Sequence, residues 1–159
     1  MSFAKVKFAN EKFIFLYSLK NFNFASNEEM IKSDYIQYWK IGSEKDWSAV
    51  ETLFEKGNYV QGVFFGHLVL EKLLKAHWVK DNVEDIPPKT HNLIWVAEKT
   101  QIKFNTKELS FLNEMTRYQS LSRYSDYSYD LFRILNKTRS EEIFIETNRL
   151  KIWLHTLLP

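Results

Sequence analysis

The chain from about residue 27 onward repeats its apolar residues every three or four positions, which is the spacing of an amphipathic α-helix. The longest such stretch runs from Tyr59 to about Val79 and is followed by an acidic loop and the helix-breaking pair Pro87-Pro88. Together with capping residues, the same pattern predicts helices over Asn27–Ile41, from Ser43 to the Gly57-Asn58 stop, from Thr90 to Gln101, from Asn105 or Thr106 to about Gln119, and from a Thr138-x-x-Glu141 capping box onward. We therefore expect an all-α fold, an up-and-down bundle of about five helices, with a polar, tyrosine-rich connection over Ser120–Tyr129.

The first 26 residues follow a different pattern. Val6 and Phe8, and then Phe13, Phe15 and Tyr17, alternate with other residues, as in a half-buried strand or hairpin. The same aromatic residues would also suit an arm that lies across a neighbouring subunit. We expect residues 1–26 to be an extension and residues 27–159 to be the bundle domain. The apolar run 13–19 is too short to span a bilayer and lacks a small-residue cleavage site, so we expect a cytoplasmic protein without membrane contact.

Composition narrows the chemistry. The chain has 159 residues, of which 45% are apolar and 26% charged, with four glycines and three prolines, as in a single helical domain. It has no cysteine, which excludes a disulfide scaffold, a thiol nucleophile, Cys-ligated zinc and an iron–sulfur cluster. The four histidines show no H-x3-H spacing and have no paired carboxylates nearby. We therefore expect no metal and no cofactor.

The charges are sorted along the chain. Their sum is 22 − 20 = +2, so any affinity for nucleic acid must come from a local patch. All five arginines lie in the last 43 residues, whereas the rest of the chain uses lysine. Arg117 and Arg123 alternate with tyrosines such as Tyr124, a combination suited to phosphate binding with base stacking. Alternatively, Asp126 and Asp130 pair with these arginines and fix the connection.

Several side chains could form a site or simply support the fold. Glu71 and Lys75 are spaced as an ion pair of one helical turn, either on a solvated face or in a groove that holds a phosphate or a partner loop. His91 follows Thr90 in the first turn of its expected helix. It either contacts a phosphate or moves a proton opposite Arg117 and Arg123, or it bonds Glu71 or a backbone carbonyl and ties two helices together. We expect His67 to be a hydrogen-bonded core histidine. Gly62 and Gly66 predict the close approach of another helix.

Three of these local patterns occur in a characteristic order. They are Tyr59-x3-Val-Phe-Phe-Gly-His67-x3-Glu71-Lys-Leu-Leu-Lys75-Ala, then Pro88-Lys-Thr-His91-Asn-Leu, then Arg117-Tyr-x4-Arg123-Tyr124-Ser-Asp. Together they resemble the HEPN domain family, small all-α prokaryotic proteins often encoded beside a minimal nucleotidyltransferase. The resemblance covers about residues 43–157. It implies a helical bundle, a homodimer, and a nucleotidyltransferase-family partner or a toxin–antitoxin-like system.

Some members of that family are endoribonucleases whose signature is an arginine followed, after four to six residues, by a histidine. At the corresponding place this chain has Arg117 and Arg123, with arginine where the histidine would stand. Because arginine is not deprotonated near neutral pH, Arg123 cannot act as general base for a 2′-hydroxyl. A literal match occurs at Arg149 and His155, but it lies near the end of the sequence. Six positions are also about 600° of helix rotation, which puts the two residues on different faces.

We therefore predict a non-catalytic HEPN protein that binds nucleic acid (RNA), a nucleotide or a partner nucleotidyltransferase. Its binding residues would be Glu71, Lys75, His91, Arg117, Arg123 and Tyr124. One alternative is a divergent, toxin-type endoribonuclease with His91 as base and Arg117 or Arg123 stabilising the phosphorane. Another is a structural interaction module that binds a partner through its aromatic N-terminal arm.

Overall fold

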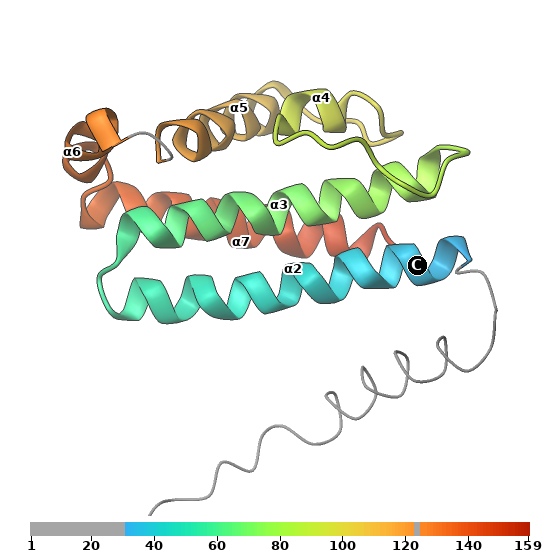
Figure 1. The fold of residues 1–159 in the computed structure, drawn as a ribbon, viewed down its shortest axis with the longest axis horizontal. Coiled ribbons are helices and arrows are strands. Elements are labelled where there is room, and N and C mark those ends of the chain that lie inside the picture. Colours follow the sequence, from blue (N-terminus) through green and yellow to red (C-terminus); the bar gives the residue numbers. More distant parts are fainter. Residues whose placement is uncertain (1–30, 123–124) are drawn as a thin grey trace, which may run out of the picture. The chain divides into compact units, whose positions relative to one another are not determined.

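The computed structural model describes residues 31–122 and 125–159, with the backbone alone for residues 125–129. These residues form six helices, which confirms the prediction of an all-α bundle (Figure 1). The helices are α2 (Lys32–Glu55), α3 (Tyr59–Asp81), α4 (Leu93–Ala97), α5 (Thr106–Leu121), α6 (Ser125–Ile134) and α7 (Lys137–Thr156). The predictions of a strand, hairpin or arm in residues 1–26, and of a boundary after residue 26, lie outside the described residues.

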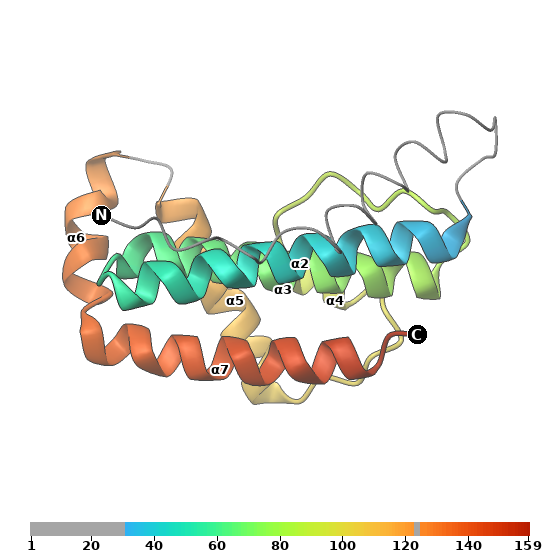
Figure 2. The ribbon, with the colours of Figure 1, turned by 90° about the horizontal axis from the view of Figure 1, so that it is seen from below.

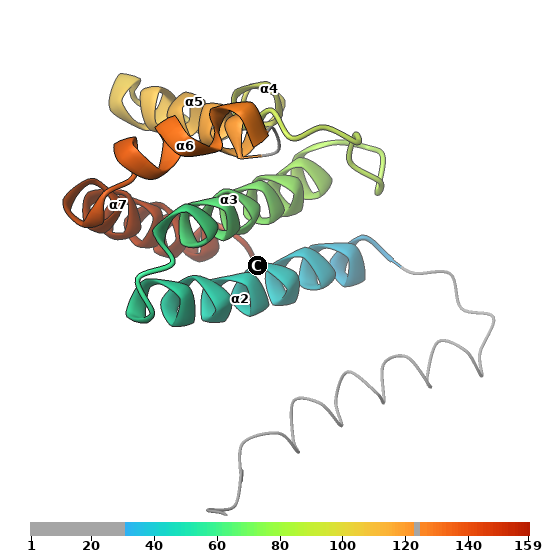
Figure 3. The same cartoon turned by 60° about the vertical axis from the view of Figure 1, so that its left-hand side comes forward.

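Helix α3 is the centre of the bundle. Helix α2 runs antiparallel along it, α7 lies against another side, and α4 with α5 covers a third (Figures 2 and 3). The reversal between α2 and α3 uses Gly57, whose positive φ of 72° suits glycine. Every residue from Leu73 to Val79 is buried, because α3 contacts helices on several sides. The sequence of α3 is accordingly apolar over most of its circumference.

Two glycines let the neighbouring helices approach α3, as predicted. A Cβ on Gly62 would lie 2.6 Å from the ring of Phe54 on α2. A Cβ on Gly66 would lie 3.4 Å from Met115 on α5 and 3.5 Å from Thr147 on α7. The glycines therefore serve different neighbours, and only the contact at Gly62 is too close for a side chain.

The expected break between two helices near Ser43 is wrong, because α2 continues through it. Ser43 is buried inside α2 and donates its hydroxyl hydrogen bond to the carbonyl of Val69 on α3 at 3.3 Å. The hydroxyl is thus satisfied by the neighbouring helix and does not cap a helix start. Gly42, beside it, packs under the side chain of Lys72.

Two other helix starts differ from the prediction, and both begin after an asparagine. The Asn92 side chain caps α4 by accepting from Trp95 N at 3.0 Å, so Thr90 is not the cap. The Asn136 side chain caps α7 by accepting from Arg139 N at 3.0 Å, so the Thr138-x-x-Glu141 capping box is wrong. Asparagine caps more strongly than threonine, which explains both shifts. The alternative placed at Asn105 is confirmed, with a complete capping box.

The expected connection over Ser120–Tyr129 is largely helical. Helix α5 continues to Leu121, and α6 begins at Ser125. Because this segment is polar and rich in tyrosine, its sequence did not indicate the start of α6 or the last turn of α5. Among the described residues, no helix is long and apolar enough to cross a membrane.

Candidate functional site

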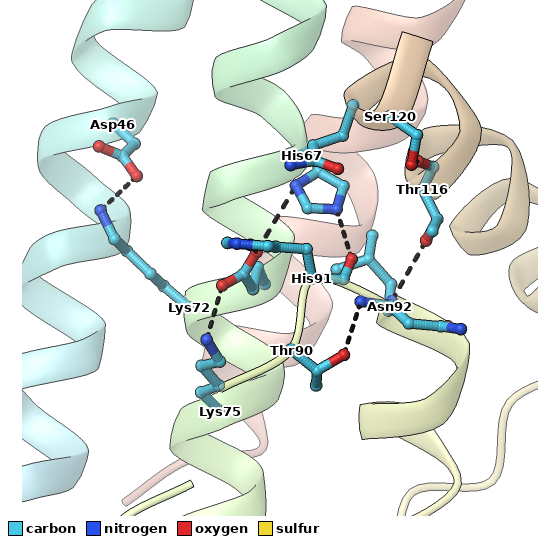
Figure 4. A network of polar contacts seen from close by, with 12 residues as sticks. Asp46, His67, Lys72, Lys75, Thr90, His91, Asn92, Thr116 and Ser120 are labelled. Atoms are coloured by element: carbon cyan, nitrogen blue, oxygen red, sulfur yellow. Dashed lines mark hydrogen bonds and ion pairs between the residues drawn. The ribbon is translucent and has the colours of Figure 1, made fainter. Parts of the chain in front are cut away.

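A buried carboxylate lies at the centre of the predicted site. Glu71 is 5% exposed on α3, and its two oxygens bind different partners. Oε1 accepts from Lys75 Nζ at 2.6 Å, and Oε2 accepts from His91 Nδ1 at 2.9 Å. His67 Nδ1 lies 3.7 Å from the same Oε2. Figure 4 shows Lys75, His91 and His67 gathered around this carboxylate.

These partners set the charge of Glu71. Burial alone would raise the pKa of Glu71. The hydrogen bonds from Lys75 and His91 and the nearby positive charge of Lys75 lower it by a larger amount, so the net pKa lies below its ordinary value. Glu71 is therefore ionised in the folded protein at neutral pH. An ionised carboxylate has no proton to donate and acts only as an acceptor toward both partners.

Lys75 connects this carboxylate to an aromatic pair on α2. Its ammonium lies 5.2 Å from the ring centroid of Trp39, within cation–π distance, and the residue is 7% exposed. Trp39 in turn meets the ring of Tyr38 edge-on, at 5.3 Å, and Tyr38 is 63% exposed. The predicted pair of Glu71 and Lys75 is therefore present, but it is buried and does not lie on a solvated face.

The segment before α4 holds His91 against α3. His67 Nε2 donates to the carbonyl of His91 at 3.0 Å, because a carbonyl oxygen only accepts. Two residues further on, Leu93 N donates to Thr116 Oγ1 of α5 at 3.2 Å. His91 thus lies on a segment fixed to both α3 and α5, with its side chain 49% exposed. Its predicted tie to Glu71 is confirmed, although it precedes α4 and is not in the first turn of that helix.

His67 is a core histidine, as predicted. It is fully buried on α3, and its Nε2 is satisfied by the backbone of His91. Its role is to fix the main chain of the segment whose side chain reaches Glu71.

Arg117 follows Thr116 on α5, and Thr116 is the residue that accepts from Leu93 N. It is exposed and forms no ion pair with the described part of the chain. Arg139 differs, since it binds Glu114 at 2.5 Å and Glu142 at 2.6 Å. Arg117 therefore remains available to an anion.

The literal match of Arg149 and His155 is not a site. Arg149 binds Glu108 of α5 at 3.2 Å and Glu146 at 2.7 Å. His155 lies 3.9 Å from Glu44 of α2. The two side chains face different helices, as their spacing predicts.

Arg123 and Tyr124 lie outside the described residues, as do the side chains of Asp126 and Tyr127. Their part in the site stays a prediction. Within the described residues, no group of three or more His, Cys, Asp or Glu side chains is placed to hold a metal ion.

Sequence reasoning missed the contact of Trp39 with Lys75 and the ion pair of Lys72 with Asp46, whose atoms lie 2.5 Å apart. Both contacts join α2 to α3, and Figure 4 shows the ion pair of Lys72 with Asp46. The helical stripe of apolar residues in this part of α2 indicates that Trp39 faces inward. It could not have indicated that its neighbour is a lysine, because that requires the register between two helices.

A family model of the HEPN domain matches residues 36–151, which is well over half of the chain. No curated protein and no solved structure matches. The match includes the Glu71, Lys75 and His91 cluster together with Arg117, and the chain belongs to the HEPN domain family.

Proposed function

We propose that this HEPN protein binds an RNA, a nucleotide or a nucleotidyltransferase-family partner, without cleaving it, at the surface around His91 and Arg117. The observation that carries the proposal is the state of these two side chains. His91 is half-exposed and held by a buried carboxylate, and Arg117 is exposed without an ion pair in the described part of the chain. The free guanidinium suits the phosphates of such a ligand, and the fixed imidazole offers a further hydrogen bond to another of its groups.

The six predicted residues have two different roles in this proposal, positioning His91 or contacting the ligand. Glu71 and Lys75 are buried against each other, so they position His91 and do not contact the ligand. His91 and Arg117 provide the contacts. Arg123 and Tyr124, which follow α5 in the sequence, would extend the surface with a second guanidinium and a ring for stacking.

A divergent endoribonuclease is the second candidate. It is favoured by the bond between Glu71 and His91, because a carboxylate on Nδ1 orients an imidazole whose Nε2 takes a proton. Arg117 or Arg123 would then stabilise the phosphorane. RNA cleavage by the wild type that disappears in His91→Ala and in Arg123→Ala would support this function in place of binding without cleavage. Absence of cleavage, or cleavage that survives both changes, would leave it without support.

We also propose that the protein is a homodimer in the cytoplasm. As the family resemblance implies, it would belong to a toxin–antitoxin-like pair. Large apolar side chains are exposed on the last two helices, including Phe132, Ile145 and Ile152, and an oligomer would cover such residues. Light scattering of the purified full chain tests this directly. A mass of one chain at all concentrations would contradict it.

The experiment for binding uses the full chain and a fluorescent single-stranded RNA at several salt concentrations. We expect binding that weakens with salt, and Arg117→Ala to reduce both the affinity and the salt slope. Lys107→Ala is the matched control, since it removes an exposed cation from the same helix, ten residues earlier. Binding that is indifferent to salt and to Arg117 would contradict the proposal.

A further inference from the structure

The position of one proton on His91 follows from its partner. Nδ1 of His91 lies 2.9 Å from Oε2 of Glu71, and that carboxylate is ionised. Because an ionised carboxylate only accepts, the hydrogen of this bond belongs to Nδ1. In the neutral imidazole the other nitrogen, Nε2, then carries the lone pair and acts as an acceptor.

The two ring nitrogens of His91 cannot easily exchange their roles as donor and acceptor. A half-turn of the imidazole would break the bond to Glu71 and leave one oxygen of a buried carboxylate without its donor. The main chain of His91 is also fixed by the donor from His67. Nε2 has no hydrogen-bond partner within residues 31–122 and 125–159, and about half of the side chain is exposed. In the neutral imidazole, the atom offered to a ligand is therefore an acceptor in a fixed place.

We infer that His91 Nε2 accepts a hydrogen bond from a ribose 2′-hydroxyl, so that the site prefers RNA to DNA of the same sequence. The inference rests on the proposed function and names its ligand. Phosphate oxygens carry no proton at neutral pH, so they cannot donate to Nε2. The 2′-hydroxyl is the donor that each RNA nucleotide has and each DNA nucleotide lacks. Arg117 would bind phosphates of both polymers alike.

Glu71 is the positioning residue in this scheme, and Lys75 makes it testable. In Glu71→Gln, Lys75 can only donate, so it keeps the amide oxygen on its own side. The amide nitrogen of Gln then faces His91 Nδ1, which must accept. The imidazole proton moves to Nε2, and the ligand-facing atom becomes a donor. The variant keeps the size of the side chain but reverses the hydrogen bond offered to the ligand.

The test uses the full chain at about pH 8, where an ordinary imidazole is neutral. Long-range proton–nitrogen spectra of histidine report which ring nitrogen carries the proton. We expect Nδ1–H for His91 in the wild type and Nε2–H in Glu71→Gln. The binding probes are one single-stranded RNA, the DNA of the same sequence, and the 2′-O-methyl RNA. We expect the wild type to bind the RNA about two- to tenfold more tightly than either of the others, as for one net hydrogen bond.

Each outcome bears on the inference. A ratio of RNA affinity to DNA affinity that falls to about one in Glu71→Gln and in His91→Ala supports it. His91→Ala removes a half-exposed side chain, so it remains informative if Glu71→Gln does not fold. Equal binding of RNA and DNA by the wild type, a preference that survives His91→Ala, or an Nε2–H proton in the wild type would overturn the inference. The proposed binding of RNA would survive all three results. Failure of the wild type to bind either polymer would overturn the RNA-binding form of the proposed function together with the inference.

Discussion

Lys75 and Glu71 face each other one helical turn apart on α3, 2.6 Å from nitrogen to oxygen, with both side chains buried. Such a pair contributes little net stability relative to well-packed apolar residues, because both charges have lost water. Its value here is that it holds a charged carboxylate in place for His91. Removing one partner leaves the other as an uncompensated buried charge.

Lys75→Met should therefore reduce the free energy of unfolding by about 3–5 kcal/mol, measured by urea denaturation. The matched control is Lys137→Met. Like Lys75, Lys137 pairs with a glutamate one helical turn away, here Glu141 at 3.8 Å, but the side chain of Lys137 is 72% exposed. We expect the control to lose less than about 0.5 kcal/mol. Similar losses in both variants would contradict the assignment of the Lys75 pair as buried and coupled.

The helices that are long and strongly periodic could be predicted from the sequence, and α3 is the clearest case. The continuity of α2 could not, because the polar group of Ser43 is satisfied by Val69 on another helix. Helix α4 starts after Asn92 and not after Thr90. Both side chains can cap a helix, and local spacing does not decide which of them does. Tertiary contacts and competing caps therefore account for the differences.

Gly62→Ala should destabilise the fold, because the new methyl group would lie 2.6 Å from the Phe54 ring. We expect a loss of about 1–3 kcal/mol in the free energy of unfolding, as for other overpacked cores. Gly66→Ala is the control, since its methyl would lie at 3.4 Å or more from its neighbours. There the better helix propensity of alanine should offset the tighter packing, leaving stability unchanged or higher. If Phe54→Ala fails to lessen the effect of Gly62→Ala, the clash is not its cause.

The site was partly visible in the sequence. The spacing of Glu71 and Lys75 predicted their pair, and Glu71 was one of the two partners expected for His91. Burial was not visible, because it depends on α2 and on Trp39, more than 30 positions away from Lys75. The division between residues that position and residues that face solvent therefore needed the three-dimensional arrangement.

Asn105→Ala should weaken the start of α5. Asn105 accepts from Glu108 N and its own N–H donates to the Glu108 side chain, both at 3.0 Å. Losing the side-chain half of this box should cost about 0.5–2 kcal/mol of unfolding free energy. Asn113→Ala, an exposed change within the same helix, should cost nothing or be slightly stabilising. A loss at Asn113 equal to that at Asn105 would rule out capping as the reason.

His77 should make the fold sensitive to mild acid. It is fully buried on α3, and its Nε2 donates to the carbonyl of Leu154 on α7 at 2.8 Å. Burial lowers the pKa of His77, with a smaller contribution from Lys80, and these outweigh the opposing effects of the Leu154 carbonyl and Asp81. The folded protein thus keeps His77 neutral at a pH at which the unfolded chain protonates it.

Because the unfolded state then binds more protons, stability should fall as the pH drops below about 6.5, the ordinary value for histidine. Glu71, whose pKa is also lowered, should add a second loss below about pH 4.5. His77→Gln keeps a donor for Leu154 but cannot titrate, so it should flatten the first loss and leave the second. Urea denaturation of both proteins between about pH 8 and pH 3 measures this. An unchanged slope near pH 6 in His77→Gln would mean that another group causes the acid sensitivity.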